Sequence, residues 1–155
     1  MKARLDENND DSGHRLKLIR DAHNVKEKVL EQHTNRMEDY LEVIYELIRK
    51  KGYATQTDIS ESLNVSLPSV SKMLQRLDES KYLKYEKYRG LNLTEEGIKV
   101  AENIREKHDL LSEFFKMIDV DEDVANIDAE GIEHHLHPQT LKKLREFIRN
   151  HKKEA

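Results

Sequence analysis

The residues with the clearest chemical potential lie late in the chain, where Glu130, Glu133 and His134 are spaced three and four residues apart. On a helix this spacing places all three side chains on one face. Carboxylate and imidazole groups together are metal ligands, and an oxygen-rich set suits Mn²⁺ or a similar hard cation. The same spacing also fits a solvated acidic face, so the motif alone leaves both interpretations open.

Two other places in the chain carry residues of the same chemical types. His108 falls within an apolar stripe at helical spacing, formed by Ala101, Ile104, Leu111, Phe115 and Ile118. It is either a packed core histidine or a ligand that faces another helix. Asp39 and Glu42 lie three residues apart and point away from the apolar stripe of their own helix. A solvated acidic face is the alternative interpretation for this pair.

The hydrophobic pattern predicts the elements that position these residues. A helix from Thr34 or Asn35 to about Lys50 has a buried stripe of Met37, Leu41, Ile44 and Ile48. A polar stretch precedes it, of which Met1–Gly13 is expected to be disordered. The elements expected after it are helices from Thr55 or Thr57 to Leu63 and from Pro68 to Glu79, strands at 82–86 and 91–93, a helix at 94–118, a linker at 119–126, and helices at 127–136 and 140–150.

Three helices followed by a β-hairpin is the order of a winged helix-turn-helix, whose last helix enters the DNA major groove. The expected face of that helix carries residue types that bond phosphates and base edges, and the hairpin adds basic residues. The candidate DNA-binding residues are Pro68, Ser69, Ser71, Lys72, Gln75, Arg76, Lys87 and Arg89. An ordinary solvated helix with a surface hairpin is the alternative.

Composition excludes several classes of function. The 155 residues are 36 % hydrophobic and 37 % charged, with a net charge of −4 and few Gly (5) or Pro (2), which favours helices. Because there is no Cys, disulfides, zinc-thiolate sites and thiol nucleophiles are excluded. No long apolar run or signal-like N-terminus is present, so a cytoplasmic location is expected. No catalytic motif is present either, so we expect no enzyme.

Three separated motifs, in this order, resemble the diphtheria toxin repressor family of metal-dependent repressors. They are Met37–Tyr45 (MEDYLEVIY), Tyr85–Leu91 (YEKYRGL) and Glu130–His135 (EGIEHH). The resemblance covers about residues 35–150. It implies a mainly α chain, with a winged helix-turn-helix DNA-binding domain followed by an all-helical dimerisation and metal-binding domain. The expected divisions are a polar, partly disordered extension at 1–33, the DNA-binding domain at 34–94 and the dimerisation and metal-sensing domain at 95–155.

The resemblance also implies six metal ligands, which are Asp39, Glu42, His108, Glu130, Glu133 and His134. In the manganese-type branch these positions hold two Mn²⁺ ions per subunit. Iron-type members carry Met at the position of Asp39 and Cys at that of Glu130, so this chain resembles the manganese-type branch. The implied function is a manganese-responsive repressor that binds double-stranded operator DNA as a homodimer and controls manganese uptake, with no membrane or small organic substrate as partner. A metal-independent winged-helix regulator that senses an organic ligand is the alternative.

Overall fold

The computed structural model describes residues 9–23, 25–86 and 90–154, and the chain forms two compact units, Met1–Thr34 and Asn35–Ala155. In the first unit, helix α1 spans Asn9–Ala22. The expectation of disorder through Gly13 is therefore wrong from Asn9 onward, and residues 1–8 lie outside the described part.

The second helix, α2, spans Val25–Lys51 and ends at Gly52, which has a φ of +86°. It begins about ten residues earlier than the expected cap at Thr34 or Asn35, so both residues lie inside the helix. The sequence from Val25 to His33 holds good helix formers and neither Gly nor Pro, so nothing there interrupts the helix. Of the expected stripe, Leu41 and Ile44 are fully buried, and Met37 and Ile48 are partly buried against the same core.

The next two helices, α3 (Gln56–Leu63) and α4 (Leu67–Glu79), pack against each other as a helix-turn-helix. Thr55 caps α3 and exchanges reciprocal hydrogen bonds with Asp58. Asn64 turns the chain at the end of α3 with a left-handed φ of 52°, a conformation that asparagine tolerates well. Ser66 then caps α4, and Pro68 lies in its first turn. These local signals explain why the boundaries of this motif are readable in the sequence.

The wing is an antiparallel hairpin of β1 (Leu83–Glu86) and β2 (Gly90–Leu93), in which Leu83 pairs with Leu93 and Glu86 with Gly90. Its base is fixed to the helix that follows it. Thr94 donates from its backbone N–H to the Tyr82 carbonyl at 3.1 Å and from its hydroxyl to the Lys81 carbonyl at 2.7 Å. A Cβ at Gly97 would lie 2.0 Å from the same Tyr82 carbonyl oxygen, so only glycine allows this close approach.

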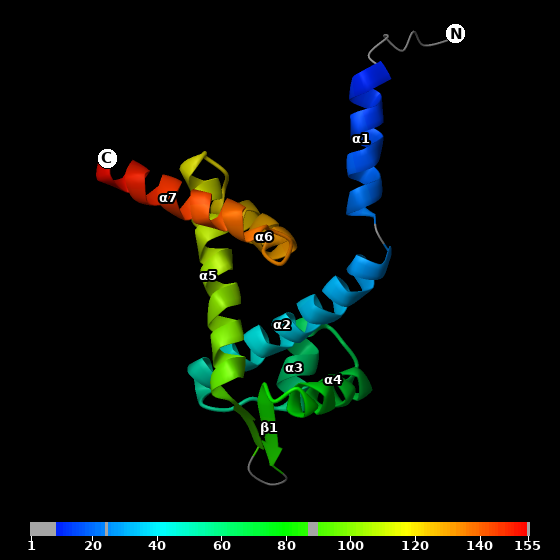
Figure 1. Ribbon diagram of the computed structural model, residues 1–155. Helices are drawn as coiled ribbons and strands as arrows, with labels where there is room; N and C mark the ends of the chain where they lie inside the picture. The colour runs from blue at the N-terminus through cyan, green and yellow to red at the C-terminus, as the bar shows by residue number, and fades with distance from the viewer. Residues whose placement is uncertain (1–8, 24, 87–89, 155) are drawn as a thin grey trace. The chain divides into compact units, whose positions relative to one another are not determined.

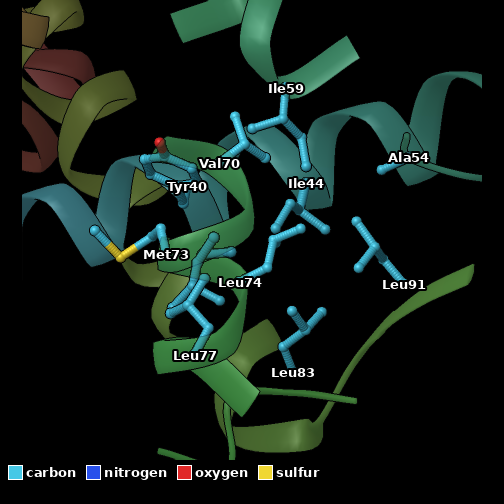
Figure 2. Close-up of a cluster of buried hydrophobic side chains, with 12 residues drawn as sticks. Tyr40, Ile44, Ala54, Ile59, Val70, Met73, Leu74, Leu77, Leu83 and Leu91 are labelled. Atoms are coloured by element: carbon cyan, nitrogen blue, oxygen red, sulfur yellow. The ribbon is translucent and has the colours of Figure 1, made fainter. Parts of the chain in front are cut away.

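One hydrophobic core joins α2, α3, α4 and the hairpin (Figure 2). Four buried residues of α4 face α2 and the hairpin, and they are Val70, Met73, Leu74 and Leu77. Ile44, Ile59 and Leu83 contribute one fully buried side chain each from α2, α3 and β1. Burying α4 on one side in this way leaves its opposite side free to meet another molecule.

Three helices complete the chain, and they are α5 (Glu95–Met117), α6 (Glu122–Ile132) and α7 (Pro138–Glu154). Both α6 and α7 pack against α5 (Figure 1). The mainly α fold, with a winged helix-turn-helix followed by a helical second part, is therefore confirmed. No helix within the described residues is long and apolar enough to cross a membrane.

Two sequence predictions in this second part are wrong in detail. The expected linker at 119–126 is half helix, because α6 begins at Glu122 and ends at Ile132 rather than running from Ile127 to Leu136. Ala125 and Ala129 bury α6 on α5, whereas Ile127 is 70 % exposed. Pro138 does not separate two helices but opens α7, since proline fits the first position of a helix.

Candidate metal centre

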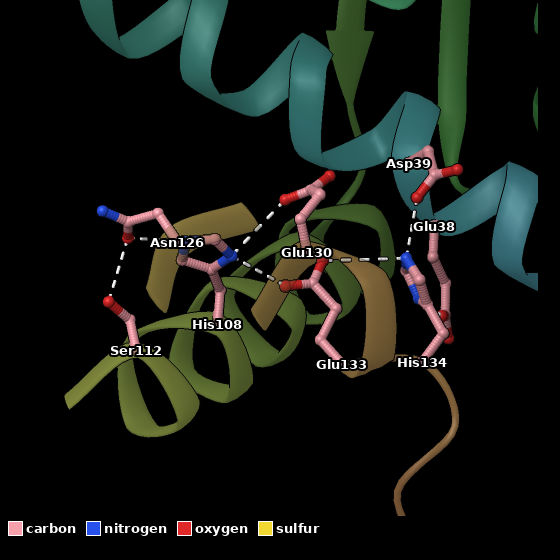
Figure 3. A network of polar contacts seen from close by, with 8 residues as sticks. All are labelled: Glu38, Asp39, His108, Ser112, Asn126, Glu130, Glu133 and His134. Atoms are coloured by element: carbon pink, nitrogen blue, oxygen red, sulfur yellow. Dashed lines mark hydrogen bonds and ion pairs between the residues drawn. The ribbon is translucent and has the colours of Figure 1, made fainter. Parts of the chain in front are cut away.

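Three of the predicted ligands meet where the end of α6 packs against the middle of α5 (Figure 3). The Nδ1 atom of His108 lies 2.9 Å from Glu133 Oε2 and 3.4 Å from Glu130 Oε2. One ligand atom from each of the three residues falls within 4.8 Å of the others, which is close enough for one cation to contact all three. His108 is therefore neither a solvated residue nor a core histidine surrounded by apolar groups.

Glu133 is the most unusual residue of the cluster because its side chain is fully buried. It occupies the C-cap of α6, and its backbone N–H donates to the Ala129 carbonyl. Its Oε1 atom has no hydrogen-bond partner among the described residues and lies 3.7 Å from His134 Nε2. Burial and the neighbouring charge of Glu130 raise the pKa of Glu133 to about 7. A buried, incompletely paired carboxylate of this kind is stabilised by a cation.

A second group of contacts joins His134 to α2. The Nε2 atom of His134 lies 2.7 Å from Asp39 Oδ1, and its Nδ1 atom lies 2.6 Å from Glu38 Oε2. Burial alone would lower the pKa of His134, but its hydrogen bonds and ion pairs with Asp39 and Glu38 raise that pKa to about 10. These contacts link α2 to the residue that follows the C-cap of α6.

Glu42 lies one turn after Asp39 on α2, close enough for the charges of Glu130 and Glu133 to affect it. Burial, followed by repulsion from Glu133 and Glu130, raises the pKa of Glu42 to about 7. Glu42 and Glu130 also line one open groove of about 540 Å³. All six predicted ligands thus belong to one electrostatically coupled region, in two neighbouring groups linked by Glu133.

The donor set suits a hard divalent cation, because it consists of four carboxylates and two imidazoles with no sulfur. Repulsion among the carboxylates and the unpaired Oε1 of Glu133 are both relieved by positive charge at this place. The structure also shows three participants that the sequence did not indicate. Glu38 contacts His134, while Asn126 and Ser112 form hydrogen bonds on the far side of His108.

The predicted DNA-binding face of α4 is open to solvent. Pro68, Ser69, Ser71, Lys72 and Gln75 are exposed, and Arg76 is half-buried. The Ser71 hydroxyl donates to Gln56 Oε1 at 2.8 Å, which ties this face to α3. Lys87 and Arg89 of the wing lie outside the described residues. Basic and polar groups on one solvent-facing side of α4 can bond phosphates and base edges.

Two family models match adjacent stretches of the chain. The N-terminal DNA-binding domain of the iron dependent repressors matches residues 32–91. The metal binding and dimerisation domain of the same repressors matches residues 94–154. Both domains belong to a repressor and neither to an enzyme, in agreement with the prediction that the chain is not an enzyme. The exact domain limits at 33, 94 and 95 stay a prediction.

The chain is also similar to solved structures of metal-dependent regulators. The manganese regulator SloR is 30 % identical with a TM-score of 0.65, over 73 % of this chain and 53 % of that one. IdeR of T. acidophilum is 31 % identical with a TM-score of 0.64, over 72 % and 53 %. The manganese-activated repressor ScaR, in its apo form, is 27 % identical with a TM-score of 0.63, over 71 % and 53 %. The chain spans about half the length of these relatives.

Proposed function

Because the chain belongs to the family of iron dependent repressors, we propose that it is a transcriptional repressor that binds operator DNA as a homodimer when Mn²⁺ occupies a two-metal site. Within the family we assign it to the manganese-type branch, because its sequence resembles that of the manganese transport regulator. A repressor must reach chromosomal DNA, so a cytoplasmic location follows from this proposal.

The observation that carries the proposal is the convergence of His108, Glu130 and Glu133 beside the contact between His134 and Asp39. We assign the metal to these five residues together with Glu42. When bound, the two cations supply four positive charges against four carboxylates. Asp39 and Glu42 lie on α2, which packs in the core of the DNA-binding part. The other four residues lie on α5 and at the end of α6. Metal binding therefore couples the DNA-binding part to the dimerisation part.

The donor types support manganese over iron as the physiological metal. Asp39 and Glu130 occupy the positions at which iron-type members carry Met and Cys, so this chain offers oxygen where those members offer sulfur. Mn²⁺ is a hard cation that prefers oxygen ligands. The name of the similar regulator SloR and that of ScaR both connect those proteins with manganese.

The mechanism we propose is a population shift. Without metal, repulsion among the carboxylates opposes one fixed arrangement of the two parts, as the raised pKa values of Glu42 and Glu133 indicate. Neutralising this charge favours the arrangement in which the two α4 helices of a dimer are spaced for successive major grooves, about 34 Å apart. Exposed apolar residues of α6, Ile127 and Ile132, are available for the dimer interface.

The test is the affinity of the protein for DNA from its own upstream region, measured by fluorescence anisotropy with Mn²⁺ and with a chelator. We expect Mn²⁺ to tighten binding at least about tenfold, within the range usual for coupled sites. Glu130→Gln should abolish the increase, and Asp128→Asn, the same kind of change at an exposed position of the same helix, should retain it. Equal affinity with Mn²⁺ and chelator would favour the metal-independent regulator that senses an organic ligand.

A further inference from the structure

A short chain of hydrogen bonds lies beside His108, on the side of the ring away from Glu130 and Glu133 (Figure 3). The Oδ1 atom of Asn126 lies 3.2 Å from His108 Nε2. The Ser112 hydroxyl donates to the same Oδ1 atom at 2.9 Å. Ser112 is only 4 % exposed, so this chain is shielded from solvent at its inner end.

The orientation of the Asn126 amide follows from a third hydrogen bond. Its Nδ2 atom donates to the backbone carbonyl of Glu122 at 2.9 Å. Because a carbonyl oxygen only accepts, the amide NH₂ must be the group at that position. The Oδ1 atom must then face Ser112 and His108, and a flipped amide would bring two oxygens together at Glu122.

The fixed amide requires a proton on one nitrogen of His108. Oδ1 of Asn126 only accepts, so Nε2 of His108 has to donate. A protonated ring nitrogen has no lone pair for a metal, whereas Nδ1 faces Glu130 and Glu133. Glu133 Oε2, 2.9 Å from Nδ1, can itself accept a proton from that nitrogen, so the amide assigns the proton to Nε2 once a cation takes the lone pair of Nδ1.

We propose that Asn126, held by Ser112 and by the Glu122 carbonyl, is a positioning residue that fixes the tautomer and ring orientation of His108 and so presents Nδ1 to the metal. This inference rests on the proposed metal-dependent function and names a specific determinant of its site. Partners of this kind, which bond the second nitrogen of a ligating histidine, commonly change metal affinity tenfold to hundredfold when removed.

His134 provides an internal contrast. Its two ring nitrogens lie near the carboxylates of Asp39 and Glu38, and either carboxylate can accept a proton from the ring. At His108, in contrast, carboxylates face only Nδ1, and Nε2 faces the neutral amide oxygen of Asn126. The carboxylates that could share a cation with His108 therefore lie on the Nδ1 side of its ring.

The first test is the ¹⁵N spectrum of the histidine rings in the protein loaded with Zn²⁺ as a diamagnetic probe. We expect His108 to bind Zn²⁺ through Nδ1 and to keep a protonated, pyrrole-type Nε2. Zn²⁺ bound at Nε2 of His108, or loss of the Nε2 proton, would overturn the inference without any variant being made.

The second test is Mn²⁺ affinity by calorimetry in three full-length variants. Asn126→Ala should bind Mn²⁺ about tenfold to hundredfold more weakly. Asn126→Asp keeps an accepting oxygen for Nε2 but loses the donor to the Glu122 carbonyl, so it should bind Mn²⁺ more tightly than Asn126→Ala. Asn103→Ala makes the same change at an exposed position on α5 and should bind like the parent. Parent-like affinity in folded Asn126→Ala would refute a positioning role.

Failure of this inference and failure of the proposed function give different results. If Mn²⁺ does not promote operator binding in the parent protein, the proposed function is wrong, whatever the ring spectrum shows. If Mn²⁺ does promote it while Zn²⁺ binds His108 at Nε2, the function stands and the role of Asn126 is wrong. Should Asn126→Ala fail to fold, Ser112→Ala removes one support of the amide, and it should lower Mn²⁺ affinity less than tenfold but measurably.

Discussion

Replacing Glu133 by Gln should stabilise the metal-free protein while it weakens metal binding. Glu133 is fully buried, its Oε1 atom has no hydrogen-bond partner among the described residues, and Glu130 adds a second negative charge beside it. Gln keeps the shape of the side chain and removes the charge. A residue kept only for stability would give the opposite result, because its replacement would destabilise the fold.

The magnitude follows from the pKa of Glu133, which rises from 4.5 to about 7 in the folded protein. Each pKa unit corresponds to about 1.4 kcal/mol, so at pH 8 the ionised side chain costs the metal-free fold about 3 kcal/mol. The Gln amide adds a buried donor that needs a partner, which offsets part of this gain. We expect a net increase of about 1–2 kcal/mol in the free energy of unfolding.

Urea unfolding in the presence of a chelator measures this free energy for both proteins at several pH values. Because a raised acid pKa makes the folded state hold more protons, the advantage of Glu133→Gln should grow from pH 4.5 to pH 7 and then level off. Glu130→Gln should give a smaller gain, since the Glu130 side chain is 60 % exposed. A pH-independent difference, or a loss of stability at pH 8, would refute the reasoning.

Four other predictions follow from the same geometry. Lys72→Ala on the exposed face of α4 should weaken binding to all DNA sequences about equally. It should also lower the slope of log affinity against log salt concentration by about one. An unchanged slope in anisotropy titrations would exclude a phosphate contact. Mn²⁺ binding should release protons from Glu42, Glu133 and His134 and should tighten as pH rises through 7 and on towards 10. Calorimetry in buffers of different ionisation enthalpy measures the release, and a pH-independent affinity would contradict it. Asp39→Met should extend activation from Mn²⁺ to Fe²⁺ in anaerobic operator-binding assays. In the same assays Zn²⁺, which prefers four ligands, should bind the parent protein tightly but activate it poorly. Equal activation of the parent protein by Zn²⁺ and Mn²⁺ would refute this geometric argument. Gly97→Ala should destabilise the fold by about 1–3 kcal/mol in thermal or urea unfolding, because the added Cβ would meet the backbone carbonyl of Tyr82. Stability equal to that of the parent protein would show that the wing can shift to make room.

The DNA-binding part is largely readable from the sequence because its signals are local. Thr55 and Ser66 cap helices, Asn64 adopts the left-handed turn, and the apolar stripe of α4 is buried as the helical period predicts. Each of these signals acts within a few residues, so distant contacts do not alter it.

Helix boundaries that depend on distant packing could not be predicted in the same way. Burial of α6 on α5 uses Ala125 and Ala129, which are too small to mark a hydrophobic face in a sequence pattern, while Ile127 is exposed. The motif of Glu130, Glu133 and His134 was expected on one continuous helix. Instead α6 ends at Ile132, so Glu133 caps it and His134 follows it.

The residues of the candidate site were likewise predictable only in part. Residue types and spacing pointed to Glu130, Glu133 and His134, but only the family resemblance joined them with His108 on another helix. Glu38 and Asn126 were not predicted, because neither stands at a ligand-like spacing, and both become evident only through hydrogen bonds to a histidine. Supporting residues of this kind are specified by tertiary contacts rather than by a motif.

The central claim is that metal and DNA binding are coupled, and the most direct test is the affinity of the protein for Mn²⁺ with and without saturating operator DNA. Coupling between two sites is reciprocal, so operator DNA must raise Mn²⁺ affinity by the same factor by which Mn²⁺ raises operator affinity. We predict matching factors of at least about tenfold in the parent protein. Identical Mn²⁺ affinity with and without the operator would contradict the account.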